Sequence, residues 1–265
     1  MTTILEEYGL SDSYLQNRGL GNTQEFVAGA ELEIEAVRDF SSSWLINHGI
    51  NMENDGSLRN AGKEFLLPPS KRKDLLDLFT GIHDPAVLAK GRNPYSIRTS
   101  THVHVNCLYS TPQQVKNLLL LYSIFEPLAF SYVGEERMNN IHCVPLNFTT
   151  IPNKYALRLN QQVERWHKYT AFNLLPLREL GTVEFRHLGG TDDPEIFGTW
   201  LLFIETLWNV VHNEISDLGK NLLIDLKVLR SVQERLMTPA FIRLCTNKPD
   251  FVLEDNLLDV KLAYI

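Results

Sequence analysis

Cysteine is scarce in this sequence of 265 residues. The three cysteines, Cys107, Cys143 and Cys245, are odd in number and lie far apart. This spacing matches neither a zinc-binding pattern nor the disulfide framework of a small secreted protein. The simpler prediction is a protein that resides in a reducing compartment.

Long hydrophobic runs and a leader-like beginning are also missing. The most apolar segments, near residues 118–130 and 200–211, are interrupted by Glu126 and Glu205. Both are shorter than the roughly 20 residues that a membrane-spanning helix requires. The first residues are acidic, whereas a signal peptide starts with a basic region followed by an apolar one. We therefore predict a cytoplasmic protein with no membrane partner.

The sequence has no excess of positive charge and lacks several catalytic fingerprints. The 25 Lys and Arg residues are outnumbered by 32 Asp and Glu residues, a formal net charge of -7, which disfavours nucleic acid as a partner. The sequence contains no G-x-x-x-x-G-K-[ST], H-E-x-x-H or G-x-S-x-G pattern, and Gly19-Leu20-Gly21 lacks the third glycine of a dinucleotide fingerprint. No motif therefore supports a P-loop, zincin, dinucleotide-binding or α/β-hydrolase function.

What is present is a series of short alternating segments separated by helix signals. Alternation of apolar and polar residues predicts strands at residues 26–37, 51–58, 63–67, 102–106 and 182–187, the third ended by Pro68-Pro69. Cap and proline signals predict helices that begin near Asp39, Ser70, Thr111 and Asp193, and a further helix over 153–167. This pattern predicts an α+β domain with a largely antiparallel sheet backed by helices. We predict one domain over residues 26–265, helical from about residue 194, and leave residues 1–25 unassigned.

Acidic side chains share one face of the first predicted strand. Successive side chains of a strand point to opposite faces, so Glu31, Glu33 and Glu35 lie together, opposite the apolar residues between them. Like charges at this spacing repel, and either solvent or bound cations must relieve the repulsion. Taken alone, the segment is more typical of a solvated acidic edge than of one wall of a metal site.

Two later strands repeat this arrangement with different chemistry. His102 and His104 share a face beside Asn106, which fits metal ligation or phosphate contact as well as a structural role. Glu184 and Arg186 share a face on the strand at 182–187. They form either a surface ion pair worth under about 1 kcal/mol or a metal ligand beside a phosphate-binding guanidinium.

Two further acidic residues extend the set. Glu64 lies in an otherwise apolar strand, where an unpaired buried charge is costly. Asp55-Gly56-Ser57 has the composition of an ordinary turn. A single sheet would gather these carboxylates and imidazoles from four strands onto one polar surface.

The order of these motifs resembles the amidoligase family, within the carboxylate–amine ligases that include glutamine synthetase and glutamate–cysteine ligase. The similarity covers about residues 26–210. The segments that carry it are Gly29-Ala30-Glu31-Leu32-Glu33, Asp55-Gly56-Ser57-Leu58, Glu64-Phe65-Leu66-Leu67-Pro68-Pro69, Thr101-His102-Val103-His104-Val105-Asn106, Tyr169-Thr170-Ala171-Phe172-Asn173-Leu174, Gly181-Thr182-Val183-Glu184-Phe185-Arg186 and Gly190-Thr191.

The resemblance implies a curved sheet of the glutamine-synthetase-like type, with helices on its outer face and ATP and Mg²⁺ on its concave face, Mn²⁺ being the alternative ion. It implies the metal ligands Glu31, Glu33, Glu64, His104 and Glu184. It places Arg186 on the transferring phosphoryl group and Asn173, Tyr169, His102 and Asn106 along the nucleotide or substrate cleft, with His102 also a candidate ligand. Asp55 is assigned speculatively as the acceptor of the amine's proton. The substrate-clamping arginines do not align, which leaves Arg92, Arg98, Arg158 and Arg165 as unranked candidates.

The predicted activity is ATP-dependent joining of a small-molecule or peptide carboxylate to an amine, in a chain that could form a homo-oligomer. Two alternatives stay open. His102-Val103-His104 resembles the histidine pair of metal-dependent amidohydrolases, although their repeating strand–helix pattern is missing. A non-catalytic scaffold that retains the ligase fold is the other.

Overall fold

The computed structural model describes residues 2–21, 25–146, 158–214, 226–247 and 250–264. Its centre is a six-stranded antiparallel sheet with the strand order β3-β4-β1-β6-β8-β7. The strands are β1 (Val27–Ile34), β3 (Asn51–Glu53), β4 (Lys63–Lys71), β6 (Ser100–Asn106), β7 (Phe172–Asn173) and β8 (Thr182–Gly189). A second, two-stranded sheet joins β2 (Val37–Phe40) to β5 (Leu88–Lys90). The predicted mixed α/β class with an antiparallel sheet is confirmed.

Helices occupy most of the rest of the described chain. They are α1 (Ile4–Tyr8), α2 (Ser13–Asn17), α3 (Ser42–His48), α4 (Arg72–Ile82), α5 (Pro112–Val133), α6 (Glu135–Met138), α7 (Leu159–Glu164), α8 (Pro194–Asn209), α9 (Leu226–Leu236), α10 (Pro239–Leu244) and α11 (Leu253–Tyr264), with a 3-10 turn η3 (Leu175–Arg178) and a π turn η4 (Val210–Glu214). Thr111 caps α5 with the predicted reciprocal box, and Asp193 caps α8. Among the described residues, no helix has the length and apolarity needed to cross a bilayer.

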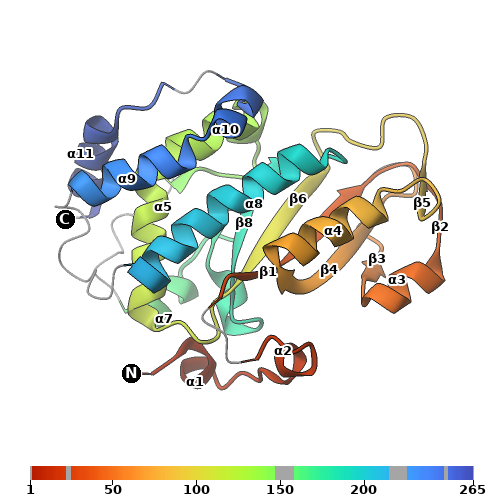
Figure 1. Ribbon diagram of the computed structural model, residues 1–265, viewed down its shortest axis with the longest axis horizontal. Helices are drawn as coiled ribbons and strands as arrows, with labels where there is room; N and C mark the ends of the chain where they lie inside the picture. Colours follow the sequence, from red (N-terminus) through yellow and green to blue (C-terminus); the bar gives the residue numbers. More distant parts are fainter. Residues whose placement is uncertain (1, 22–24, 147–157, 215–225, 248–249, 265) are drawn as a thin grey trace.

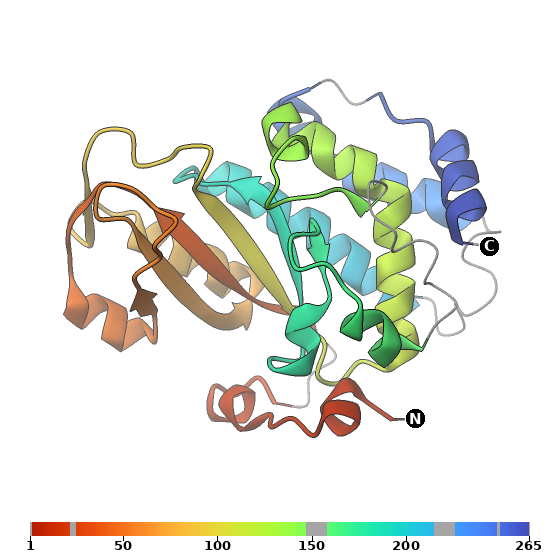
Figure 2. The ribbon, with the colours of Figure 1, turned by 180° about the vertical axis from the view of Figure 1, so that it is seen from behind.

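The two faces of the sheet have different surroundings. Helices α4 and α8 lie across the face seen in Figure 1. Figure 2 shows the strands from the opposite side, where α1 and α2 lie along one end. The alternation of β1 explains the difference, because Ala30, Leu32 and Ile34 are buried toward the helices while Glu31 and Glu33 point the other way. Hydrophobic burial on one face therefore determines which face presents the carboxylates.

Aromatic stacking fills the layer between the sheet and its helices. Phe79 of α4 stacks on Phe197 of α8 with ring centroids 4.2 Å apart. Tyr122 of α5 stacks on Phe172 at 4.8 Å and meets Phe185 edge-on at 5.8 Å. Offset-stacked and edge-to-face pairs of this kind add to the stabilisation from burial. They attach β7 and β8 firmly to α5.

A buried polar network also supports β8 from the helical side. Tyr122 Oη donates to Glu126 Oε1 (2.8 Å) and lies 2.6 Å from His187 Nε2. Burial and the Arg137 charge lower the pKa of His187 to about 3, so this imidazole is neutral and can donate to Tyr122. Arg137 donates to the carbonyls of His187 (2.8 Å) and Arg186 (2.6 Å). The backbone of β8 is thus held at Arg186 and His187 from the helical side of the sheet.

Several predicted boundaries are wrong, and β4 shows the clearest physical reason. It continues through Pro68-Pro69 to Lys71, and Ser70 lies in the strand, where its hydroxyl donates to Pro68 O (3.0 Å) instead of capping α4. The pairing of β1 with β4 shifts register between Ala28 and Ala30, beside the two prolines. A bulge tolerates residues that cannot donate to the ladder.

Three other predicted segments are shorter than expected. The strand predicted over 51–58 ends at Glu53, and the strand predicted over 26–37 ends at Ile34, since Ala36 adopts a φ of 54° and turns the chain into β2. Of the helix predicted over 153–167, residues 153–157 lie outside the described residues. In the rest of that range the helix is α7, which ends at Glu164.

We predict that Gly29→Ala destabilises the protein by about 1–3 kcal/mol, a typical cost of overpacking. A Cβ at Gly29 would lie 2.9 Å from the carbonyl oxygen of Leu67, which is backbone and cannot rotate away. Gly56→Ala is the matched control, because a Cβ there meets nothing within 4 Å, and it should change stability by under about 0.5 kcal/mol. Urea unfolding measures both, and equal stabilities would contradict the close approach of β1 and β4.

Candidate functional site

The register of the sheet brings four strands' polar side chains together on the face opposite the large helices. Cα pairing sets Glu33 against Glu64, Glu31 against His102, and His104 against Glu184. Antiparallel partners lie about 4.5–5.5 Å apart, so side chains distant in sequence are direct neighbours. The predicted gathering of these residues on one surface is what the structure describes.

Glu31 is the central carboxylate of this surface. Its Oε2 lies 3.0 Å from His102 Nδ1, and its Oε1 lies 3.0 Å from His104 Nε2. Burial acts to raise the pKa of Glu31, but hydrogen bonds and charge from the two imidazoles outweigh burial and hold that pKa far below its usual range. Glu31 is therefore an anion, which can share either a proton or a metal ion with the neighbouring imidazoles.

Glu184 is the most buried acid of the group, with its side chain 4% exposed. Its Oε2 accepts a 2.7 Å bond from Asn173 Nδ2, and its Oε1 lies 3.3 Å from His102 Nδ1 and pairs with Arg186. Arg186 Nε in turn donates to His142 O (3.2 Å). These contacts fix the orientation of the Glu184 carboxylate.

His104 carries the feature that best fits a metal. Its Nδ1 lies 3.1 Å from Thr182 Oγ1, whereas its buried Nε2 lies 3.0 Å from Glu31 Oε1 without the alignment of a regular hydrogen bond. Burial acts to lower the pKa of His104, but contact with Glu31 outweighs burial and raises it. One ligand atom from each of Glu31, His104 and Glu184 lies within 4.8 Å of the other two. An imidazole anchored through one nitrogen, with the other free beside two carboxylates, is the usual arrangement of a metal-ligating histidine.

His102 connects the two halves of the acidic surface. Ser100 Oγ donates to Glu33 Oε2 (2.5 Å) and also lies 2.7 Å from His102 Nε2. The other ring nitrogen of His102, Nδ1, lies 3.0 Å from Glu31 Oε2. Both nitrogens are engaged, so His102 positions carboxylates here.

The second half of the surface is purely acidic. Glu64 lies between Glu33 on β1 and Glu53 on β3 in the register of the sheet. Burial, followed by the charges of Glu31, Glu33, Asp55 and Glu53, raises the pKa of Glu64 to about 8. The carboxyl group therefore holds a proton near neutral pH, and a divalent cation could replace that proton.

The other predicted site residues have varied positions. Asn173 holds Glu184 and caps η3 by accepting from Leu175 N (3.0 Å). Asn106 is buried, and its Oδ1 accepts from Leu108 N (3.1 Å). Tyr169 lies in a loop, with its ring 4.8 Å from that of His142.

Asp55 and Glu35 are engaged in local structure. Asp55 is in a turn, where it accepts from Ser57 N (2.7 Å), although it is near enough to raise the pKa of Glu64. Glu35 is buried at 3% exposure and accepts from Arg59 N (3.0 Å). The sequence left open whether Glu35 is solvated; the structure places it beyond β1 and away from solvent.

The four candidate arginines lie in different surroundings. Arg98 donates to Ser57 O (3.1 Å) and so joins the loop before β6 to the turn that holds Asp55. Arg92, Arg158 and Arg165 are exposed. Among the described residues, these three arginines have no hydrogen bond or ion pair to the acidic surface. The substrate clamp therefore stays a prediction.

Sequence reasoning missed Ser100 and Glu53. Ser100 continues the alternation of His102 and His104 by one more step along β6, and this spacing was the available signal. Glu53 required knowledge that β3 pairs beside β4, since nothing in its local sequence marks it.

A cavity of about 430 Å³ adjoins the cluster. Glu31, His104 and Thr182 line its inner side. The rest is mostly apolar, and we call it the leucine cavity after its main lining residues, Tyr14, Leu15, Leu66, Leu67, Leu108 and Leu180. Its volume falls in the range of small-molecule sites.

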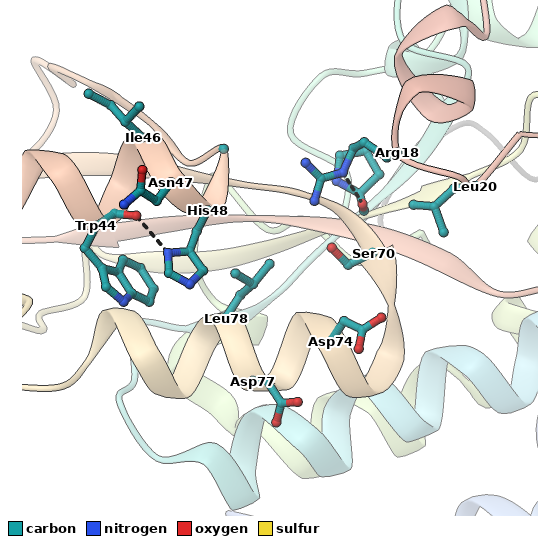
Figure 3. Close-up of a pocket in the computed structure, with 12 residues that line it drawn as sticks. Arg18, Leu20, Trp44, Ile46, Asn47, His48, Ser70, Asp74, Asp77 and Leu78 are labelled. Carbon is teal, nitrogen blue, oxygen red and sulfur yellow. Dashed lines mark hydrogen bonds between the residues drawn. The ribbon is translucent and has the colours of Figure 1, made fainter.

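A larger hollow of about 650 Å³ lies between α2, α3 and the start of α4 (Figure 3). It contains the stacked rings of Trp44 and His48, whose centroids are 4.0 Å apart, and Arg18, which donates to Pro69 O (3.2 Å). None of its lining residues belongs to the carboxylate and imidazole cluster. Size alone therefore does not identify the chemical site, and we place that site at the cluster.

Neither a protein-family model nor a curated protein sequence matches the chain. Among solved structures, a bifunctional glutathione synthetase from Pasteurella multocida is similar, with a TM-score of 0.45 and 9% sequence identity. The similarity covers 96% of this chain and 50% of that chain, so this chain spans half the length of that protein. A similarity this low does not establish a common function.

We predict that Mn²⁺ raises the thermal stability of the protein and that Glu184→Gln abolishes this rise. A ligand at 100 times its Kd stabilises the native state by about 2.7 kcal/mol, and Glu184 is one of three ligands that converge on a single point. The readout is the metal-induced change in Tm for each protein. Glu254→Gln, which alters only an exposed pair with Arg230, is the control and should respond as the parent does. An unchanged response in Glu184→Gln would contradict this metal site.

We predict that Glu64→Gln stabilises the metal-free protein at pH 8 and not at pH 5. The folded-state pKa of Glu64, about 8, lies above the ordinary glutamate pKa of 4.5. Between these values the native state binds a proton that the unfolded state releases, so stability falls as the pH rises. Glutamine removes that penalty.

Unfolding curves of Glu64→Gln at both pH values test this, and Glu136→Gln, an exposed residue of α6, is the control. A stability difference from the parent that does not change with pH would show that the neighbouring acids do not raise the pKa of Glu64.

Proposed function

We propose that the protein is an ATP- and divalent-metal-dependent carboxylate–amine ligase of the glutamine-synthetase-like type. The single observation that carries this proposal is the buried Nε2 of His104, which faces the carboxylates of Glu31 (3.0 Å) and Glu184 (3.9 Å) without a well-aligned hydrogen bond. An all-antiparallel sheet with helices on one face and acidic residues on the other supports the fold type. The resemblance of the motif order to amidoligases supports the reaction.

The proposed reaction has two steps. The substrate carboxylate attacks the γ-phosphorus of ATP, which breaks the bond to the β-phosphate oxygen and releases ADP. The amine then attacks the acyl phosphate, inorganic phosphate leaves, and the amine nitrogen loses a proton as the amide forms. Both steps build negative charge on oxygen, which must be neutralised by fixed positive groups.

The chain's own residues are suited to hold those groups. Glu31, His104 and Glu184 would hold one cation, and the all-oxygen pair Glu33 and Glu64 suits Mg²⁺ at a second position. Bound there, the cations would neutralise phosphate charge and polarise the reacting phosphoryl group. His102 and Ser100 orient the carboxylates from behind.

Arg186 is proposed to contact the phosphoryl group that is transferred. It uses one nitrogen on Glu184 and one on His142 O, and a guanidinium has five N–H donors, so others stay available. Asn173 keeps Glu184 in place and is a positioning residue in this proposal. Asp55 remains the proposed acceptor of the amine's proton, and Tyr169 and Asn106 remain proposed contacts of the cleft.

We predict ATP-dependent hydroxamate formation when the protein is incubated with ATP, Mg²⁺ or Mn²⁺, hydroxylamine and pooled carboxylic acids. Hydroxylamine traps an acyl phosphate whatever the natural amine is. Arg186→Gln should lower the rate by about 10²–10³-fold, as expected for loss of one charge-stabilising donor. Arg243→Gln, which removes only an exposed pair with Glu195, should leave the rate unchanged.

Hydrolysis of amides without ATP would replace the ligase proposal with the hydrolase alternative. Binding of metal without phosphate release, hydroxamate or hydrolysis across the pools would favour a non-catalytic scaffold.

A further inference from the structure

The leucine cavity has a specific charge pattern. Among the described residues that line it, the charged side chains besides His104 are two acids, Glu31 and Glu179, and none is a lysine or arginine. A carboxylate or phosphate group placed inside would lose hydration and meet the like charge of both acids. The cavity therefore suits a ligand whose polar end is cationic or neutral.

The walls of the cavity are apolar over most of their area. Leu66 and Leu67 come from β4, Leu108 follows β6, and Leu180 precedes β8. An apolar group gains binding free energy with each methylene that it buries against such walls. The cavity would thus reward an aliphatic or aromatic body and discriminate against a small polar one.

The outer wall is supplied by the N-terminal segment. Tyr14 and Leu15 of α2 line the cavity, and Leu15 packs with Leu20, Val27 and Leu108 in a separate small core. Backbone bonds from Ile4 N to Ser110 O and from Leu5 N to Leu108 O, each 2.9 Å, fix α1 to the loop after β6. These contacts hold the segment over one end of the polar face, as Figure 2 shows.

We infer that the leucine cavity binds the amine substrate of the ligase, and that this amine carries an apolar body. The inference rests on the proposed function for the role of the ligand, but the binding preference can be measured without it. The amino group would lie toward Glu31, where the metal cluster is, and the body would lie between α2 and the leucines. The N-terminal segment, outside the predicted domain of residues 26–265, then serves as a wall of the substrate site.

Calorimetric titrations of the metal-free protein in the absence of ATP test the inference with three probes. They are 3-methylbutylamine, ethanolamine, and 3-methylbutanoate, which has the same branched body on an acid. We expect 3-methylbutylamine to bind at least tenfold more tightly than either of the others. Equal affinities for the two amines, or tighter binding of the acid, would overturn the inference.

Variants locate the preference in the cavity. Leu66→Ser should reduce the affinity ratio of 3-methylbutylamine to ethanolamine at least fivefold. Leu180→Ser should reduce it in the same direction and is safe for folding, since Leu180 is already 58% exposed. Ile242→Ser, at a 47% exposed position of α10, is the control and should keep the parental ratio. A parental ratio in both leucine variants would overturn the assignment.

The two proposals fail in distinguishable ways. Selective amine binding that depends on the leucines, without hydroxamate formation in any carboxylate pool, would leave the cavity assignment standing and refute the ligase. Hydroxamate formation with no preference for the apolar amine would do the reverse.

Discussion

Repulsion between glutamate carboxylates on one face of a sheet is the constraint on which this site depends. Glu31 and Glu184 lie on strands separated by β6, and its two imidazoles lie between them. Where imidazoles are present, their hydrogen bonds and charge outweigh burial and hold the pKa of Glu31 far below its usual range. Where imidazole is missing a proton does the same task, and the pKa of Glu64 rises to about 8. Such a face is suited to bind cations, because a cation can take the place of the imidazole proton beside Glu31 or of the proton on Glu64.

Such a face requires a rigid opposite side. The apolar residues of the strands pack on α4, α5 and α8, and Tyr122 contacts the aromatic residues of β7 and β8. Behind the cluster, Arg137 binds the carbonyls of Arg186 and His187, while Asn173 holds Glu184 on the cluster side. A functional carboxylate positioned to a few tenths of an ångström needs this support, since its ligand geometry tolerates little displacement.

Much of this site was readable from the sequence because the period of a strand is local. The alternation that separates Glu31 from Leu32 needs no knowledge of the neighbouring strands. What failed depends on neighbours: Pro68-Pro69 would end an isolated strand, but the two prolines are accommodated by the bulge in β4 opposite Gly29. Ser100 is a common residue whose role appears only when Glu33 lies beside it. The N-terminal helices could not be placed at all, because their anchor is a tertiary contact between Leu15 and Val27.

The placement of those helices changes the electrostatics of the sheet. An open acidic face would be screened by water, whereas a wall formed by Tyr14 and Leu15 excludes water from one end and strengthens the interactions that remain. In the proposed ligase, this wall would also separate the recognition of dissimilar substrates. Nucleotide and carboxylate would use the cations of the cluster, and an apolar amine would use the leucines. Because the two regions meet at Glu31 and His104, each substrate would bind in its own environment with the reacting atoms close together.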